Sequence, residues 1–358
     1  MVDGSQVNGL AYDGTLIDGR GRRDDSPLPL ATYTVAANSR HRFRVVNSGA
    51  EIFYEMMIDA HVLDIVALDG MEIVPVTVDS FIIAPGERVD FEVDTNAPID
   101  RYWFRAEMLR EGKLDVSAIP NLVITSDGLT LGTNAIIVYE GSTGNTDPTS
   151  TRRVCTATNP CVVFNCPYQA VRADQYTTCL TLNDAQTIET DAYLQEIYGT
   201  QDTDIVEYFL NFGIHSGPTV NGKVFQSPMV PFSQDNSAHI INCDDPDCGT
   251  GCRCTNMLDM PFNKTIQLVL YNYFPASLIL GHHAVHLHGH TFAIMTSGYP
   301  DTDPVTGVPI GQNDDILCDS PLCLNGVWNG GQPSFNAKPV LKDTAIVPAR
   351  GYLVIRFR

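Results

Sequence analysis

Residues 80–95 have the sequence SFIIAPGERVDFEVDT, two short apolar runs joined by Pro85-Gly86. A Pro-Gly pair marks a turn, and runs rich in Val, Ile and Phe on either side of a turn predict two β-strands. Comparable runs lie at 41–47, 101–109, 265–273, 291–295 and 344–357. Helical periodicity is weak, and its best candidate is a short piece within 181–199. Many short strands with regular turn signals predict an all-β protein of sandwiches or barrels.

Length and charge narrow the classes of function. The chain has 358 residues, of which 44% are hydrophobic, so it can bury a sizeable core. Its 22 basic and 42 acidic residues give a formal net charge of −20. Such an acidic chain is repelled by nucleic acid and by anionic membranes, so we expect neither as a partner. No apolar run is long enough for a membrane-spanning helix.

A change of composition suggests two domains. Residues 141–151, GSTGNTDPTST, contain no apolar side chain and are rich in Gly, Ser and Thr. Such a polar stretch is typical of an interdomain linker. We therefore predict one domain at 1–141, a linker at 142–151 and a second domain at 152–358.

The ten cysteines lie in three loop-like clusters, with Asn, Asp, Pro and Gly as neighbours. An even number of loop cysteines predicts disulfides and an oxidising compartment; their connectivity stays open. The sequon Asn263-Lys264-Thr265 agrees with an extracellular location. No signal peptide begins at Met1, so we expect any secretion signal to lie outside this sequence. The alternative for Cys243, Cys248, Cys252 and Cys254 is a structural zinc site.

The segment 281–295, GHHAVHLHGHTFAIM, holds five of the nine histidines within nine residues. Neutral imidazole is the commonest metal ligand, and histidine-rich tracts indicate metal binding. In an extended chain, alternate side chains share a face, which would direct His286, His288 and His290 one way and His283 the other. The Cα atoms of His286 and His288 would be about 6.6 Å apart, a spacing that suits two adjacent metals. Zinc, copper, iron and nickel all remain open at this point.

This histidine segment resembles the strand H-P-x-H-x-H-G-H in the third cupredoxin domain of laccase-like multicopper oxidases. Ala284 stands where that pattern has proline. The resemblance implies that His283 ligates the type 1 copper, His286 the type 2 copper and His288 one copper of the type 3 pair. Copper is then the implied cofactor.

Other stretches extend the resemblance over nearly all of the chain. Residues 75–106 are similar to the family's middle cupredoxin domain, which carries no copper ligands, and 342–358 to the stretch before its final H-C-H motif. The implied fold is two cupredoxin-like Greek-key β-sandwich domains, the second incomplete at its C-terminus. The sequence contains neither the H-x-H motifs of the family's first domain nor the H-C-H motif, so we expect a partial chain. The cysteine-rich inserts favour an animal laccase over a fungal one.

The resemblance also implies a reaction. The full-length protein would oxidise phenols, aromatic amines or ferrous iron and reduce dioxygen to water. Because a trinuclear copper cluster takes ligands from two domains, we expect this chain alone to be inactive. The alternative is a non-enzymatic extracellular β-sandwich that binds metal. The four isolated histidines are expected to be structural: His41, His61, His215 and His239.

Overall fold

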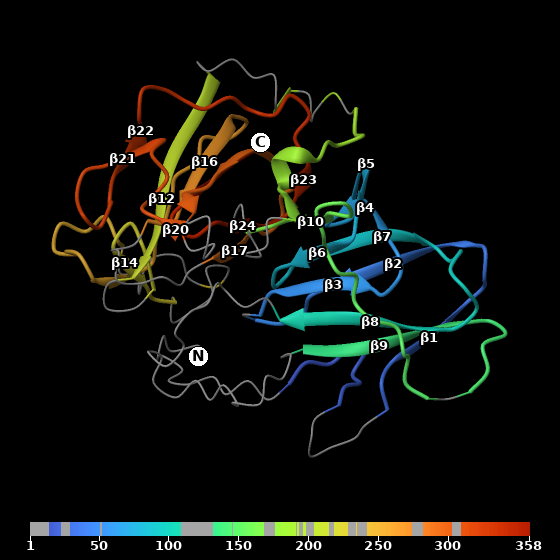
Figure 1. The fold of residues 1–358 in the computed structure, drawn as a ribbon. Coiled ribbons are helices and arrows are strands. Elements are labelled where there is room, and N and C mark those ends of the chain that lie inside the picture. The colour runs from blue at the N-terminus through green and yellow to red at the C-terminus, as the bar shows by residue number, and fades with distance from the viewer. Residues whose placement is uncertain are drawn as a thin grey trace.

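The computed structural model describes residues 14–22, 29–50, 52–108, 132–144, 146–167, 176–190, 204–214, 218–227, 242–273, 282–302 and 309–358, with positions 192, 196, 197 and 234. Strands dominate this part of the chain (Figure 1). Helical structure in these residues is limited to a 3-10 turn at Leu182–Asp184 and to positions 192, 196, 197 and 204. The prediction of an all-β protein is therefore confirmed. Within the described residues, no helix is both long and apolar enough to cross a membrane.

Two sheets make up the first half of the chain, which runs from β1 to β11. The smaller is antiparallel, in the order β2 (Arg40–Val46), β7 (Arg88–Asp94), β4 (Leu63–Leu68) and β5 (Met71–Val78). The larger has the order β1 (Thr32–Val35), β9 (Gly132–Tyr139), β8 (Arg101–Met108), β3 (Tyr54–Ile58), β6 (Ser80–Ile83), β10 (Cys161–Phe164) and β11 (Thr177–Leu180).

The stretch 80–95 connects these two sheets. Its two predicted strands form as β6 and β7 on either side of Pro85-Gly86, and each belongs to a different sheet. On β7 the side chain of Phe91 is fully buried. Its ring lies 5.3 Å from that of Phe43 and 6.0 Å from that of Phe104. Aromatic packing between the facing sheets thus forms the core of this half.

The second half, which runs from β12 to β25, is built on an eight-stranded sheet. Its order is β15 (Arg253–Cys254), β14 (Lys223–Phe225), β13 (Pro218–Val220), β12 (Ile205–Ile214), β16 (Thr265–Tyr271), β25 (Tyr352–Phe357), β18 (Phe292–Gly298) and β23 (Leu341–Lys342). Three two-stranded ladders complete it: β17 (His283–His286) with β24 (Thr344–Val347), β19 (Asp301–Thr302) with β20 (Pro309–Ile310), and β21 (Ile316–Cys318) with β22 (Gly326–Trp328). Every residue of β16 is buried, including the polar Thr265 and Gln267.

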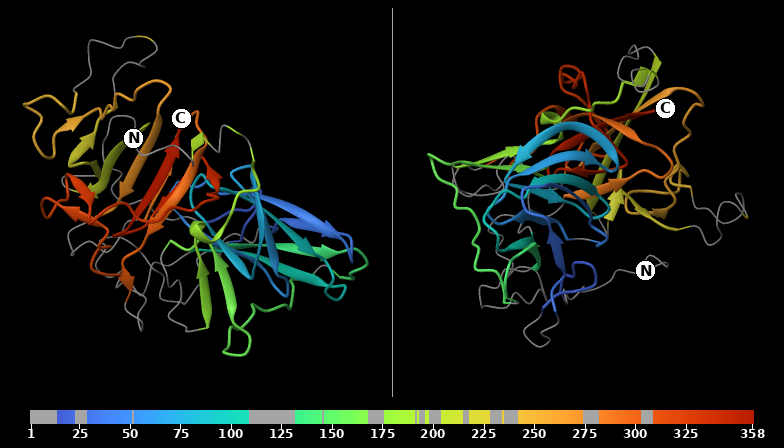
Figure 2. Two further views of the ribbon diagram at one scale, coloured as in Figure 1. Left: turned by 90° about the horizontal axis from the view of Figure 1, so that it is seen from above. Right: turned by 90° about the vertical axis from the view of Figure 1, so that its right-hand side faces the viewer.

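The two halves lie side by side (Figure 2). One cluster of buried apolar side chains includes Phe81 and Phe91 from the first half and Leu268 and Leu353 from the second. Strands β10 and β11 follow the predicted linker in sequence but extend a sheet of the first half. The domain division at 142–151 stays a prediction.

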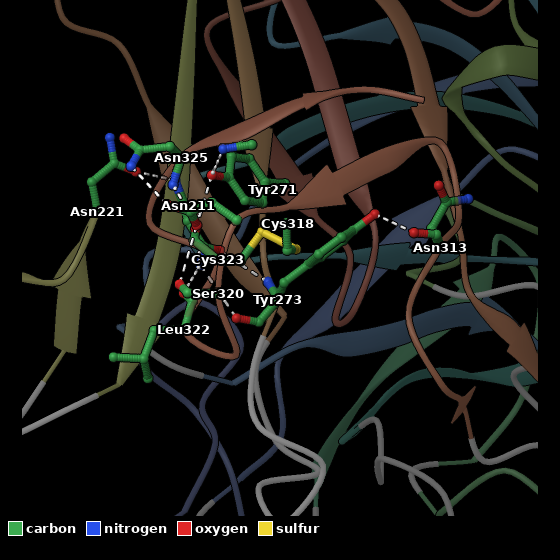
Figure 3. Close-up of a disulfide and its surroundings, with 12 residues drawn as sticks. Asn211, Asn221, Tyr271, Tyr273, Asn313, Cys318, Ser320, Leu322, Cys323 and Asn325 are labelled. Carbon is green, nitrogen blue, oxygen red and sulfur yellow. Dashed lines mark hydrogen bonds between the residues drawn. A yellow bond between two sulfur atoms is a disulfide. The ribbon is translucent and has the colours of Figure 1, made fainter. Parts of the chain in front are cut away.

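All ten cysteines form disulfides, which confirms that prediction. The pairs are Cys155–Cys161, Cys166–Cys179, Cys243–Cys254, Cys248–Cys252 and Cys318–Cys323. No cysteine is free, so the cluster considered for zinc holds two disulfides instead of four thiolates. Figure 3 shows the Cys318–Cys323 bridge, where the Asn211 amide donates to the carbonyls of Leu322 and Cys323. These hydrogen bonds fasten the loop closed by the disulfide to β12.

Candidate metal centre

The histidine segment forms β17, which pairs antiparallel with β24. His283 lies opposite Val347 and His286 opposite Thr344. Because these histidines are three residues apart on a strand, they project to opposite faces. Figure 1 shows β17 and β24 between the two halves of the molecule. One short strand can therefore present imidazoles to two different surroundings.

His286 has a defined orientation. Its Nδ1 atom lies 2.8 Å from the backbone oxygen of Asp343 and 3.0 Å from Oγ1 of Thr344. A carbonyl oxygen only accepts hydrogen bonds, so Nδ1 carries the proton and donates it. Nε2 then keeps its lone pair for a metal, the arrangement that metal-binding histidines commonly show.

His288 lies close to His286. The centroids of the two rings are 4.9 Å apart, and both side chains are exposed. His288 belongs to the turn that follows β17 and not to the strand itself. At this separation the two imidazoles can bind one metal ion or two adjacent ions.

His283 has a different environment. It is half-buried, and its ring centroid lies 6.0 Å from that of Phe212 on β12. Burial lowers the pKa of His283, because the charged imidazolium is disfavoured away from water. The neutral form is the one that binds metal. The structure thus separates His283 from the His286–His288 pair, as the strand pattern predicts.

The strand alternation ends before His288 and His290, so a common face for His286, His288 and His290 stays a prediction. Strand β17 ends at His286, and Gly289 adopts a φ of +77° within the following turn. The ring of His290 packs 5.1 Å from that of Phe357. His282, at the other end of the segment, accepts the backbone N–H of Ala349 on its Nδ1 atom at 3.0 Å. Burial lowers the pKa of His282 to about 3.

Charged residues behind the histidines were missed by sequence reasoning. Asp343 forms a two-point ion pair with Arg88, and Lys342 lies beside the carboxylates of Asp69 and Glu87. The sequence held one signal for two of these residues, the charged dipeptide Lys342-Asp343 directly before the apolar β24. Their partners lie in the first half, a long way off in sequence, so a local pattern could not identify them.

Two of the isolated histidines make contacts within the first half of the chain. Nδ1 of His61 lies 2.8 Å from the Asp59 carbonyl, and its Nε2 lies 2.6 Å from the Tyr139 hydroxyl. Nε2 of His41 lies 3.1 Å from the Ala36 carbonyl. These contacts support a structural role for His41 and His61. His215 and His239 lie outside the described residues.

These features define an all-β protein with a strand of metal-ligand character between two β units. Two family models, both described as multicopper oxidase, match residues 3–126 and 226–358. Together they cover more than half of the chain. The chain therefore belongs to the multicopper oxidases, a family of copper-dependent oxidoreductases, and its relatives place it among the laccase-like members.

Two curated relatives are fungal laccases. The laccase of Phlebia radiata is 30% identical over 321 residues, covering 85% of this chain and 52% of the relative. Laccase-2 of Pleurotus ostreatus is 29% identical over 324 residues, covering 85% of this chain and 50% of the relative. The chain spans about half the length of these relatives. Their fungal origin does not support the expectation of an animal laccase.

Solved structures show the same fold. Fet3p, described as a multicopper oxidase that functions in iron import, aligns with a TM-score of 0.59 and 21% identity over 91% of this chain and 52% of its own. The laccase from Botrytis aclada aligns with a TM-score of 0.57 and 19% identity over 97% of this chain and 53% of its own. The cupredoxin-like architecture is thereby confirmed.

Proposed function

We propose that His283, His286 and His288 are copper ligands in a laccase-like multicopper oxidase. His283 would bind the type 1 copper, His286 the type 2 copper and His288 one copper of the type 3 pair. The observation that carries this proposal is the fixed imidazole of His286, whose Nε2 is left for a metal while its ring lies 4.9 Å from that of His288. His283 occupies the opposite face of the same strand.

The donor chemistry of these residues fits copper. Imidazole nitrogen is a suitable ligand for copper, and the hydrogen bond at Nδ1 of His286 fixes the donor atom as Nε2. Two imidazoles on one short segment supply only part of the coordination of a trinuclear cluster. We propose that this chain alone does not reduce dioxygen and that ligands from a further domain complete the site.

In the full-length protein, bound copper would supply one-electron redox chemistry, with a phenol, an aromatic amine or ferrous iron as donor and dioxygen reduced to water. The task of this chain is positional. Strand β17 holds the Cα atoms of His283 and His286 about 10 Å apart at the usual rise of a strand. This short covalent path would join the site that accepts electrons to the site that uses them. The half-buried setting of His283 shields it from water more than the exposed His286.

The remaining assignments belong to the same proposal. We place the division between two cupredoxin-like domains at 142–151, with the ligand strand in the second. Five disulfides and the sequon at Asn263 support secretion to an extracellular location. Small-molecule donors and dioxygen are the proposed partners, and the net charge of −20 argues against nucleic acid.

Copper uptake by the folded chain tests this function. We would load the metal-free protein with Cu(II) and measure bound copper by titration calorimetry and by nitrogen hyperfine structure in its electron paramagnetic resonance spectrum. Replacing His283, His286 and His288 together with alanine should abolish this binding. The matched control is His290→Ala, which removes a neighbouring imidazole that packs on Phe357 and should leave binding intact. Unchanged copper uptake in the triple variant would refute the proposed ligand set.

A further inference from the structure

We propose that Arg88 and Asp69, in the half of the chain that holds none of the three proposed ligands, are positioning residues for His286. They would act through Asp343, whose backbone oxygen contacts Nδ1 of His286 at 2.8 Å. This inference rests on the proposed function, because it assigns a purpose to the orientation of a proposed copper ligand. It gives the copper-free first half a direct role in the metal site of the second.

The first link is the carboxylate of Asp69, in the turn between β4 and β5. Its Oδ2 atom accepts the backbone N–H groups of Asp343 at 3.2 Å and Thr344 at 3.1 Å. Its Oδ1 atom accepts the backbone N–H of Arg88 at 2.9 Å. One buried side chain therefore ties the start of β24 to the start of β7. The Asp343 carbonyl is held from a turn in the other half of the molecule.

The second link is the ion pair between Arg88 and Asp343. Nη1 and Nη2 of Arg88 contact the two carboxylate oxygens at 2.5 and 2.6 Å. Paired contacts of this kind fix geometry as well as adding energy. Nη2 of Arg88 also donates to the Asp69 carbonyl at 3.1 Å. The guanidinium thus sets the direction of Asp343 relative to the first half.

The third link fixes the register of the segment. Lys342 is fully buried, and its Nζ lies 3.2 Å from Asp69 and 3.3 Å from Glu87. Burial alone would lower its pKa, but the carboxylates of Asp69 and Glu87 outweigh burial and raise the pKa of Lys342, so it stays cationic. A shift of one residue would place this charge among apolar groups, which is very costly. Asp343 therefore has one position available to it.

The three links act on the side chain of His286, whose orientation depends on contacts with other residues. His286 is exposed, with 45% of its side chain open to solvent, so packing contributes little to its orientation. The contacts to its Nδ1 come from Asp343 and from Thr344, whose hydroxyl in turn donates to the Asp343 carboxylate at 2.8 Å. Both contacts lie in the segment held by Asp69 and Arg88. Loosening that segment should let the ring rotate and exchange its tautomer.

The test compares two arginines of the first half. Arg105 forms a similar paired contact with the buried Asp59, at 2.8 and 2.7 Å, but Asp59 does not contact the histidine strand in the interactions that the structure describes. Arg88→Gln and Arg105→Gln therefore each remove one two-point ion pair, and only the first pair touches Asp343. We would label histidine with ¹⁵N in the full chain, assign His286 with a His286→Gln variant, and read its tautomer by NMR without metal. Cu(II) affinity would be measured on the same proteins.

We expect wild type and Arg105→Gln to hold His286 with its proton on Nδ1. Arg88→Gln should show a mixture of tautomers and Cu(II) binding about 10-fold weaker, the lower end of the effect of losing such a supporting contact. Arg88→Lys keeps the charge without the paired contact and should show a smaller loss, which provides a second reading if Arg88→Gln does not fold. Unchanged tautomer and affinity in a folded Arg88 variant would overturn the inference, as would a changed tautomer with unchanged affinity. If wild type binds no copper, the proposed function fails, and the tautomer comparison still decides this inference.

Discussion

The ammonium group of Lys342 lies 3.2 Å from the carboxylate of Asp69, and neither side chain is more than 1% exposed. The two residues come from different halves of the chain. Glu87 adds a second carboxylate 3.3 Å from the same ammonium. A charge buried in this way stabilises the fold only together with its partners, since each is costly by itself.

Lys342→Met should therefore strongly destabilise the protein. The substitution leaves two buried carboxylates without their cation, a change that costs about 3–5 kcal/mol. The measurement is the free energy of unfolding from chemical denaturation. The control is Lys264→Met, which removes an exposed ion pair with Asp204 and should cost less than about 1 kcal/mol. Similar losses in the two variants would show that Lys342 makes no special contribution.

His61 should make stability depend on pH. Burial lowers its pKa below the ordinary value of 6.5 in the folded protein. As pH falls through 6.5 the unfolded chain takes up a proton on this residue before the folded chain does, so acid favours unfolding. The contribution is complete above pH 6.5 and is lost as pH falls toward the folded pKa.

A His61→Gln variant checks this. Between pH 6.5 and the folded pKa, the free energy of unfolding should fall less steeply in the variant than in wild type, by up to about 1.4 kcal/mol per pH unit for one proton. His41→Gln is the matched comparison, because it removes a histidine whose Nε2 lies 3.1 Å from the Ala36 carbonyl and leaves His61 in place. Equal slopes in wild type and His61→Gln would contradict the role given to burial of His61.

The strands were predictable because alternation and turn chemistry are local. In 80–95 the apolar positions and Pro85-Gly86 were sufficient to locate β6 and β7. Their membership of different sheets was not predictable, because β6 pairs with β3 and β10, and β7 with β2 and β4. Alternation shows which face a residue takes but leaves its partner strand undetermined.

The candidate site was predictable to the same extent. The concentration of histidines in 282–290 pointed to a metal site, and the opposed faces of His283 and His286 followed from strand geometry. The alternation does not reach His288 or His290, because β17 ends at His286 and Gly289 turns the chain with a positive φ. Asp69 and Arg88 could not be found, since folding alone brings them to Asp343.

The disulfides can be checked by alkylation. The denatured protein should gain no mass from a thiol-alkylating reagent without reduction, and ten alkyl groups after reduction, because no cysteine is free. Partial proteolysis and mass spectrometry of the unreduced protein should then return peptides joined as Cys243–Cys254 and Cys248–Cys252. Four alkyl groups added without reduction, and blocked by zinc, would restore the zinc alternative for this cluster.

Asn263 should carry an N-linked glycan if the chain is secreted as proposed. Asn263-Lys264-Thr265 is the one N-x-S/T sequon of the sequence, and Asn263 lies exposed in a turn. Arg358 donates to its Oδ1 at 3.2 Å, a contact that does not use the amide nitrogen to which a glycan is attached. The neighbouring Phe262 is 99% exposed, and a glycan would cover this apolar surface.

Secretion from a eukaryotic cell followed by glycosidase treatment and mass spectrometry tests this prediction. Wild type and Thr265→Ser, which keeps the sequon, should each lose the mass of one glycan. Asn263→Gln and Thr265→Val should lose none. Secreted wild-type protein with an unmodified Asn263 would show that the exposed turn is not used, and an intracellular, reduced chain would remove the basis for secretion. Because Asn263→Gln leaves the buried Thr265 unchanged, loss of the glycan in this variant reports on the sequon and not on the fold.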